Sequence, residues 1–346
     1  MTPGTDAAGL RAARRDRVFE AMGRTGLDVL VLGRRDAVAY ATGARSLWTA
    51  GTRPFGAACV LVASGRTTHL LSTWDAGVPP EVPFEHLYGI TWNPGTMAVA
   101  LRAIPGLPDA RRIGVDALSP GFERAVGRLA PGAQLVPADD VVRAVRAVKL
   151  PGEIERIRGA IAVCRAGVEA ATAALVSGSP LAEARAAAVR AVARRGATVP
   201  SSGVVVEDSG RGAVAGPAAG AGEPGGDAVH IDVGLVVDGY EGGMARTVAP
   251  AGRDDARSAA VVAAQRRVLD ACRPGATARD LRAAAAGAGR WMVRGSGMGF
   301  EPPVITGDLG ADAVIRRGMV LSVDVAVDGW GQRDLALVAE STAEVL

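Results

Sequence analysis

Two aspartates lie inside apolar stretches of the sequence, where a charged side chain is unexpected unless it has a structural or catalytic role. Asp232 lies in the apolar run 228–237, and Asp324 lies in the run 319–327. Each run predicts a buried strand, and burial of an unpaired carboxylate is unfavourable by several kcal/mol. Two such carboxylates can act as a general acid and a general base, or one of them can attack a substrate as a nucleophile.

The chain contains only three histidines, and His230 is the one nearest to a candidate carboxylate. Because side chains alternate along a strand, His230 and Asp232 point to the same side. The ordinary pKa of histidine suits proton transfer near neutral pH, so His230 is either a catalytic group or a histidine of the core. His69 alternates with apolar residues and is expected to be structural. Three histidines are too few for a histidine-rich metal cluster.

An α+β arrangement in the second half of the chain must position these residues. Asp-Gly pairs at 238–239 and 328–329 predict hairpin turns after the two acidic strands. A long helix is expected from Pro151, because proline suits the first helical turn. Further predictions are a helix from 179–180 to Gly196, a capping box at 277–280, a strand at 335–338 and a mobile loop at 210–226.

The first part of the chain alternates helical and strand-like segments, which predicts a smaller α/β domain. The expected helices are 7–22 and 121–129, and the expected strands are 27–32, 59–63, 68–71 and 112–115. A length of 346 residues also suits two domains. The predicted domains are residues 1–148 and 149–346.

Composition argues against several classes of protein. The 39 basic and 36 acidic residues are scattered and leave a net charge of +3, so no nucleic-acid partner is expected. No uninterrupted apolar stretch approaches the ~20 residues that cross a bilayer, and no signal peptide is recognisable, so neither a membrane nor export is expected. The three cysteines lie far apart, which predicts buried free thiols in a reducing cytoplasm.

Four segments, in order, resemble the aminopeptidase P, prolidase and creatinase family. They are the linker 146–158, the acidic strand and hairpin 231–248, the second acidic strand 317–324 and the segment 336–340. The resemblance implies the pita-bread fold of that family for the larger domain. It also implies a creatinase-like α/β fold for the smaller N-terminal domain.

The same resemblance indicates that the metal site of the family has been replaced. Its peptidases hold two divalent metals with two aspartates, one histidine and two glutamates, a set suited to manganese or similar ions. These positions read Asp232, Gly243, Ser296, Asp324 and Arg333 in this chain. A guanidinium cannot ligate a cation and repels it. We therefore expect no metal and no other cofactor.

Creatinase and ectoine hydrolase represent a metal-free branch of the family and act on C–N bonds of small amidine-like metabolites. The resemblance implies an enzyme for a small amino-acid-derived or guanidine-like metabolite, by hydrolysis, elimination, dehydration or cyclisation in specialised metabolism. Asp232, Asp324 and His230 are the expected catalytic residues, and Arg333 is expected to clamp a substrate carboxylate. Two alternatives stay open: Arg333 neutralises two leftover aspartates in a non-catalytic binding protein, or the chain is an atypical Xaa-Pro metallopeptidase.

Further substrate contacts are expected from positions near the family's site. Ser296 between two glycines permits close approach of a ligand, or acts as a nucleophile if a base lies nearby. The other candidates are Glu241, Arg246, Asp334 and Glu301, of which Arg246 and Asp334 alternatively form an ordinary ion pair. In family dimers the N-terminal domain reaches the partner's site, which makes His86 and Trp92 candidate contacts in a cytoplasmic homodimer.

Overall fold

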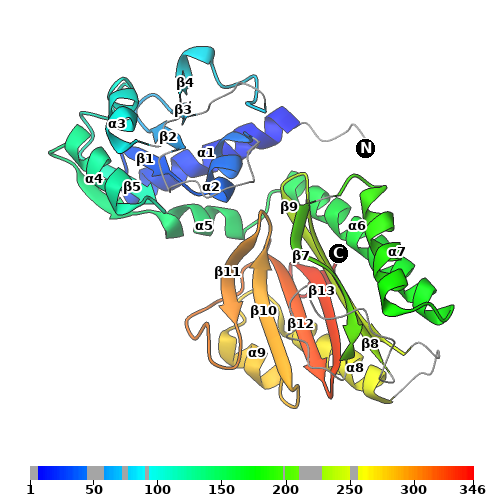
Figure 1. The fold of residues 1–346 in the computed structure, drawn as a ribbon. Helices are drawn as coiled ribbons and strands as arrows, with labels where there is room; N and C mark the ends of the chain where they lie inside the picture. The colour runs from blue at the N-terminus through cyan, green and yellow to red at the C-terminus, as the bar shows by residue number, and fades with distance from the viewer. Residues whose placement is uncertain are drawn as a thin grey trace. The chain divides into compact units, whose positions relative to one another are not determined.

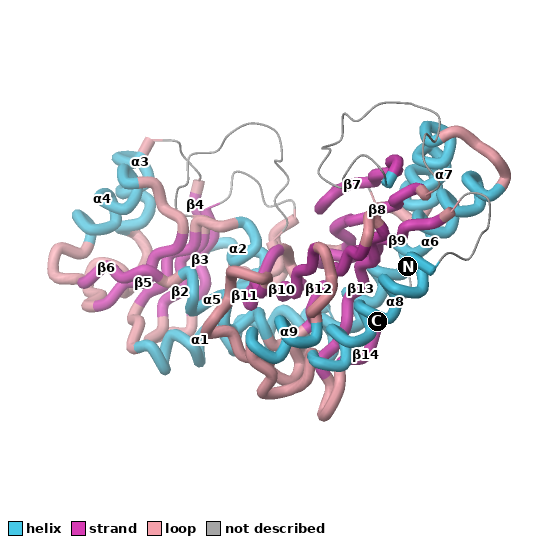
Figure 2. Tube along the Cα trace, turned by 90° about the horizontal axis from the view of Figure 1, so that it is seen from below, coloured by secondary structure: helices cyan, strands magenta, loops and turns pink. Residues whose placement is uncertain are grey.

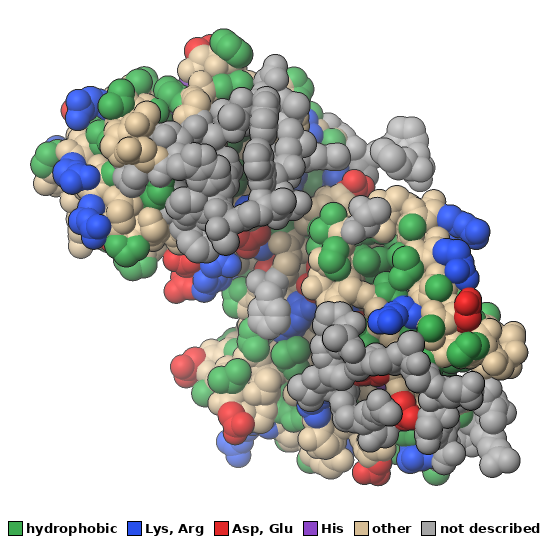
Figure 3. Space-filling view, viewed as in Figure 1, with side chains coloured by type: hydrophobic (Ala, Val, Ile, Leu, Met, Phe, Trp, Pro, Cys, Tyr) green, Lys and Arg blue, Asp and Glu red, His purple; other side chains and the backbone are tan. Residues whose placement is uncertain are grey.

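The computed structural model describes residues 7–44, 58–71, 77–89, 93–197, 199–209, 228–249 and 256–346. The chain divides into two compact units, Met1–Arg146 and Ala147–Leu346 (Figure 1). On the face drawn in Figure 3, basic and acidic side chains occur over both units among apolar and neutral ones. The predicted mobile loop 210–226 lies outside the described residues.

The N-terminal unit is built on a mixed sheet with the strand order β4-β3-β2-β1-β5-β6. The strands are β1 (Val29–Leu32), β2 (Cys59–Val62), β3 (Thr67–Leu71), β4 (Leu87–Tyr88), β5 (Arg112–Asp116) and β6 (Gln134–Pro137). The helices are α1 (Ala7–Thr25), α2 (Arg35–Thr42), η1 (Phe84–His86), α3 (Pro94–Arg102), α4 (Pro120–Leu129) and α5 (Asp139–Ala147). Apolar residues of β1, β2 and β5 form a buried core with α3 and α4. All four residues of β1 and of β2 are buried, which accounts for the uninterrupted apolar runs in these two strands.

The C-terminal unit contains an antiparallel sheet with the strand order β11-β10-β12-β13-β9-β8-β7, and β14 pairs with β13. Its strands are β7 (Val199–Asp208), β8 (Val229–Val237), β9 (Tyr240–Val248), β10 (Arg290–Ser296), β11 (Phe300–Ile305), β12 (Val320–Val327), β13 (Trp330–Val338) and β14 (Ala343–Val345). Its helices are α6 (Pro151–Val176), α7 (Leu181–Ala193), α8 (Ala256–Ala271) and α9 (Ala278–Ala284). The sequence alone did not predict β7, β10 and β11.

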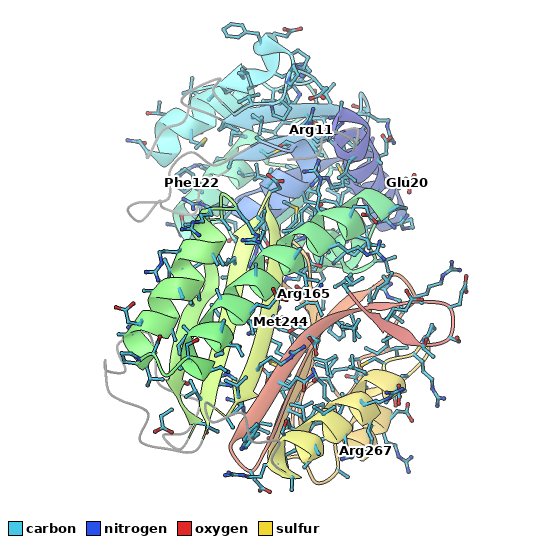
Figure 4. All side chains as sticks on the ribbon, turned by 90° about the vertical axis from the view of Figure 1, so that its right-hand side faces the viewer. Arg11, Glu20, Phe122, Arg165, Met244 and Arg267 are labelled. Atoms are coloured by element: carbon cyan, nitrogen blue, oxygen red, sulfur yellow. The ribbon has the colours of Figure 1, made fainter. Side chains whose placement is uncertain are left out.

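The helices of this unit cover one side of the sheet in two pairs. Helices α6 and α7 pack against β7 and β8, as Figure 1 shows. Helices α8 and α9 pack against β10, β12 and β13, and Figure 2 shows them beneath these strands. Met244, labelled in Figure 4, lies on this helix-covered side, in the core formed with α6 and α7. The side chains that alternate with the core residues therefore point to the opposite side of the sheet.

The turn and cap predictions are confirmed by the backbone. Asp238 and Gly239 both have positive φ angles, 50° and 83°, as a two-residue hairpin turn requires. Asp328 and Gly329 repeat this conformation at the end of β12, with φ angles of 47° and 80°. At the start of α9, Thr277 and Asp280 form the predicted capping box. These turns set the registers of the two hairpins that carry the acidic strands.

Helix α6 is anchored at its beginning to the sheet. The Glu153 carboxylate accepts hydrogen bonds from the backbone N–H of Leu150 at 2.9 Å and from the Tyr240 hydroxyl at 2.9 Å. The helix is long and apolar enough to cross a membrane by length and composition. Its apolar residues instead supply much of the core beneath β8 and β9.

The contact between α6 and β9 depends on Gly242. A Cβ atom added there would lie 2.5 Å from the backbone carbonyl of Ala160. We predict that Gly242→Ala lowers the free energy of unfolding by about 1–3 kcal/mol, because helix backbone cannot yield as a side chain can. Gly159→Ala is the control, since nothing lies within 4 Å of its added Cβ and it is exposed. Urea denaturation compares the two variants, and equal stabilities would contradict this packing argument.

Candidate functional site

One row of paired residues crosses the side of the sheet that the helices leave uncovered. The backbone register pairs Asp232 of β8 with Ala245 of β9, Ala245 with Arg333 of β13, and Arg333 with Asp324 of β12. Directly paired residues of neighbouring strands point to the same face of a sheet. We call this face, defined by Asp232, Ala245, Arg333 and Asp324, the site face. The structure thus brings together three residues that the sequence analysis selected.

Arg333 and Asp232 form an ion pair at the centre of the site face. Arg333 Nη2 donates to Asp232 Oδ1 at 2.5 Å, and the side chains are only 10% and 20% exposed. The guanidinium also lies against Gly243, where an added Cβ would be 3.3 Å from both Nε and Nη2. A larger residue at position 243 would therefore compete with Arg333 for this space. The arginine and the glycine are therefore complementary in volume.

Asp324 lies next to this ion pair in the sheet but forms no hydrogen bond with Arg333. Its strand position is opposite Arg333, yet no hydrogen bond to its carboxylate occurs among the described residues. Burial raises the pKa of Asp324 above its ordinary value, although the positive charges of Arg333 and Arg290 oppose the rise. Asp324 therefore retains its proton to higher pH than an exposed aspartate does.

His230 lies one row away from Asp232 on the site face. Its Nδ1 is 3.0 Å from Thr247 Oγ1, and the same oxygen accepts the N–H of Gly331 at 2.9 Å. Burial lowers the pKa of His230 below 6.5, although the nearby charges of Asp232 and Asp324 oppose this change. His230 therefore favours the neutral imidazole at neutral pH, which is the form that can accept a proton.

Glu241 anchors a second polar cluster on β9. Arg294 donates to both of its carboxylate oxygens, at 2.6 and 2.8 Å, and Ser296 Oγ donates to it at 3.0 Å. Burial alone would raise the pKa of Glu241, but the hydrogen bonds from Arg294 and Ser296 lower it overall. Ser296 is fully buried. Glu241 therefore holds Arg294 and Ser296 in place. The predicted substrate contacts of Ser296 and Glu241 stay predictions.

Three other predicted substrate contacts lie away from the site face. Arg246 and Asp334 form an ion pair at 2.5 Å, and each is one residue away from a site-face position, so both point toward the helix-covered side. The Glu301 carboxylate pairs with Lys149, and both side chains are only 1% exposed. Arg246, Asp334 and Glu301 therefore stabilise the fold and do not reach the site face.

The N-terminal candidates belong to the other unit. The His86 ring lies 4.3 Å from the ring of His69, and Trp92 is outside the described residues. Burial, with the neighbouring His86, lowers the pKa of His69 to about 4, which suits a neutral histidine buried in the sheet. The proposed contact of His86 with a partner subunit stays a prediction.

Two serines that the sequence analysis missed also reach the site carboxylates. Ser202 Oγ donates to Asp232 and Ser201 Oγ donates to Glu241, each at 3.3 Å. They occupy an irregularity of β7 between Pro200 and Gly203, where the register with β8 shifts. A Cβ on Gly234 would lie 2.0 Å from Ser202 Oγ, so this glycine makes the approach possible. A bulge in a strand that was not itself predicted leaves little signal in the sequence.

The sequence matches the models of two known protein families. Residues 155–335, more than half of the chain, match "Metallopeptidase family M24", and residues 14–148 match "Creatinase/Prolidase N-terminal domain". An Xaa-Pro dipeptidase of Pyrococcus horikoshii is 23% identical over 90% of this chain and 88% of its own length. Another from Pyrococcus furiosus is 27% identical over 60% of this chain and 65% of its own length.

Solved structures show the same fold. An Xaa-Pro dipeptidase from Bacillus anthracis matches with a TM-score of 0.75 at 18% identity, covering 97% of each chain. The dipeptidase PepE from Mycobacterium ulcerans matches with a TM-score of 0.71 at 24% identity, covering 99% of this chain and 96% of that one.

The residues of the site face do not fit the divalent metals that a metallopeptidase family implies. Within the described ranges, no three His, Cys, Asp or Glu side chains gather closely enough to hold a metal ion. Asp232 is paired with Arg333, and Gly243 supplies no ligand. A cation placed at this position would meet a fixed guanidinium.

The ion pair generates a stability prediction. Arg333→Met leaves Asp232 without its partner and should lower the free energy of unfolding by about 1–3 kcal/mol, because the pair is largely buried. Adding Asp232→Asn should recover part of this loss. Arg158→Met is the control, since its pair with Glu155 is exposed and should contribute less than about 0.5 kcal/mol. Thermal unfolding measures all four proteins, and a loss no larger than that of the control would refute the assigned interaction.

Proposed function

The chain belongs to metallopeptidase family M24, and we propose that it is a metal-independent enzyme of that family acting on a small amino-acid-derived or guanidine-like metabolite. The family and the pita-bread fold predicted from the four sequence segments are confirmed. The activity and the substrate class go beyond that assignment. The observation that carries the proposal is the Arg333–Asp232 ion pair on the site face, with Asp324 beside it.

Arg333 does more than balance charge in this proposal. Its Nη2 is committed to Asp232, so Arg333 holds that aspartate in place instead of clamping a substrate carboxylate. Asp232 is also hydrogen-bonded to Ser202, which leaves it poorly placed to act as a free base or nucleophile. The pair supplies a fixed dipole beside Asp324, where charge develops as a substrate bond breaks.

Asp324 and His230 carry the proton transfers. Asp324 has a raised pKa and no hydrogen-bond partner among the described residues, which suits a general acid that protonates a leaving nitrogen. His230 favours the neutral form and accepts a proton from water or from a substrate carbon. Thr247 Oγ1 can accept both Gly331 N–H and His230 Nδ1–H, because a hydroxyl oxygen has two lone pairs. That tautomer leaves Nε2 of His230 free to act as the base.

These roles suit cleavage of a C–N bond. In hydrolysis, His230 takes a proton from water as the oxygen attacks the substrate carbon, and Asp324 gives its proton to the departing nitrogen. Elimination uses the same two groups, with the proton taken from carbon. The relatives are named as Xaa-Pro dipeptidases, and dipeptide hydrolysis also cleaves a C–N bond. The three cysteines are free and buried, which supports the proposed cytoplasmic location.

The catalytic assignment predicts selective losses of activity. Asp324→Asn and His230→Gln should each lower kcat by about 10²–10⁴ and leave the fold intact. Asp328→Asn is the control, because it retains the turn conformation outside the site face. Mass spectrometry would follow turnover in a panel of N-substituted amino acids, amidines and dipeptides. Circular dichroism would verify the fold of each variant.

The pH dependence tests His230 separately. Because its folded pKa is below 6.5, the active neutral form dominates above that pKa. Activity should therefore fall on the acidic side, below pH 6.5, as His230 becomes protonated, and on the alkaline side as Asp324 loses the proton that it donates. His230→Gln should remove the acidic limb from the residual rate. Full turnover by Asp324→Asn would overturn the mechanism. Binding of a ligand that the wild-type protein never alters would indicate the non-catalytic alternative.

A further inference from the structure

Glu207 extends the site face to β7, which is an edge strand of the sheet. The register pairs Glu207 with His230 of β8, and paired residues of neighbouring strands point to the same face. Val206, the preceding residue, is buried in the core with α6 and α7. Because side chains alternate along a strand, Glu207 points away from these helices. Its carboxylate therefore lies on the site face, next to His230.

The Glu207 carboxylate has no counter-ion in the described part of the chain. Neither a hydrogen bond nor an ion pair reaches it there, and the side chain is half-buried. Burial and the negative charge of Asp232 raise the pKa of Glu207, although the positive charge of Arg290 opposes the rise. A partly buried carboxylate without a partner is unfavourable. A cation placed beside Glu207 would remove this cost.

The other carboxylates of the site face differ in how they are held. Those of Asp232 and Glu241 are each bound by an arginine. Asp324, like Glu207, has a raised pKa and accepts no hydrogen bond from the described residues. Within the described ranges, Glu207 and Asp324 are therefore the carboxylates of this face that remain available to a ligand. Asp324 is the proposed acid, which leaves Glu207 for binding.

The curvature of the sheet brings Glu207 toward the proton-transfer groups. Four strands separate β10 from β7 in the sheet, yet Arg290 of β10 lies close enough to act electrostatically on Glu207. Arg290 acts in the same way on His230 and Asp324. These side chains therefore act on one region of the site face, which suits a small ligand.

We propose that Glu207 binds a positively charged group of the substrate beside the His230 ring, and so selects guanidino, amidino or ammonium compounds over their uncharged analogues. This inference rests on the proposed function and narrows its substrate class to cations. A carboxylate accepts two parallel N–H bonds from a guanidinium, which gives orientation as well as affinity. An ammonium group is a point charge without this planar match.

A bound cation also acts on the proposed base. A positive charge beside His230 disfavours the imidazolium form, whereas the charges of Asp232 and Asp324 favour it. Binding of the cation at Glu207 therefore keeps His230 neutral and able to accept a proton. Recognition of the substrate and proton transfer are thus coupled at neighbouring strand positions.

The test compares cations with their neutral counterparts. The probes are ω-guanidino acids paired with ω-ureido acids of equal chain length, and ω-amino acids paired with their N-acetyl derivatives. Ligand-observed NMR measures Kd for each compound with the intact protein. The variants are Glu207→Gln and Glu207→Asp. Glu169→Gln controls for the loss of one negative charge, because Glu169 is exposed on α6.

The wild-type protein should bind at least one cation of the panel about tenfold more tightly than its neutral counterpart, as expected for a hydrogen bond between charged groups. Glu207→Gln should abolish this preference, Glu207→Asp should retain part of it, and Glu169→Gln should retain all of it. A preference within the guanidino pairs identifies a guanidinium site, and one confined to the amino pairs identifies an ammonium site. No preference in any pair, or a preference that survives Glu207→Gln, would overturn the inference.

Thermal unfolding distinguishes binding from a structural role. Glu207→Gln should melt at a temperature no lower than that of the wild-type protein, because the substitution removes no ion pair. A lower melting temperature would assign Glu207 to the fold and contradict the inference.

The binding measurement also separates the inference from the proposed function. Glu207-dependent preference for a cation, together with full turnover by Asp324→Asn, would retain the cation site and reject the mechanism. Turnover that requires Asp324, together with equal binding of cations and their neutral counterparts, would retain the mechanism and reject Glu207 as the selective residue.

Discussion

The chemistry of the site face depends on one ion pair, between Arg333 and Asp232. Two largely buried charges 2.5 Å apart stabilise each other only while both are present, because either one alone would be buried without compensation. The pair also requires a glycine at position 243, because the guanidinium lies close to where a side chain at this position would begin. With Asp232 fixed in this way, Asp324 and His230 are the groups that we propose exchange protons with the substrate.

The sequence analysis predicted most of the strands and turns that position this ion pair. Apolar runs ending in Asp-Gly indicated the two acidic strands, and the hairpin turns at Asp238 and Asp328 confirm it. The resemblance of four segments also implied that Asp232, Asp324 and Arg333 lie at one site. Patterns with a local physical cause, such as turn conformation and strand alternation, were therefore predictable from the residues.

Other features depend on contacts that no local pattern encodes. The approach of Ser202 to Asp232 arises from a register shift between β7 and β8, and Arg294 reaches Glu241 across 53 residues of sequence. The position of Arg246 follows from a simpler rule. It is one residue from Ala245, a site-face position, so strand alternation places it on the other side.

We propose that this chain combines the fold of its family with a metal-free site. The relatives named as Xaa-Pro dipeptidases belong with this chain by sequence and architecture, but architecture does not fix chemistry. A direct test of the replaced site is manganese binding, measured by mass spectrometry of the metal after loading and gel filtration. The comparison is between the wild-type protein and a variant carrying Gly243→Asp, Ser296→His, Asp324→Glu and Arg333→Glu. We predict that the wild-type protein retains no manganese above the buffer level and that the variant gains it; two manganese ions per wild-type chain would contradict the account.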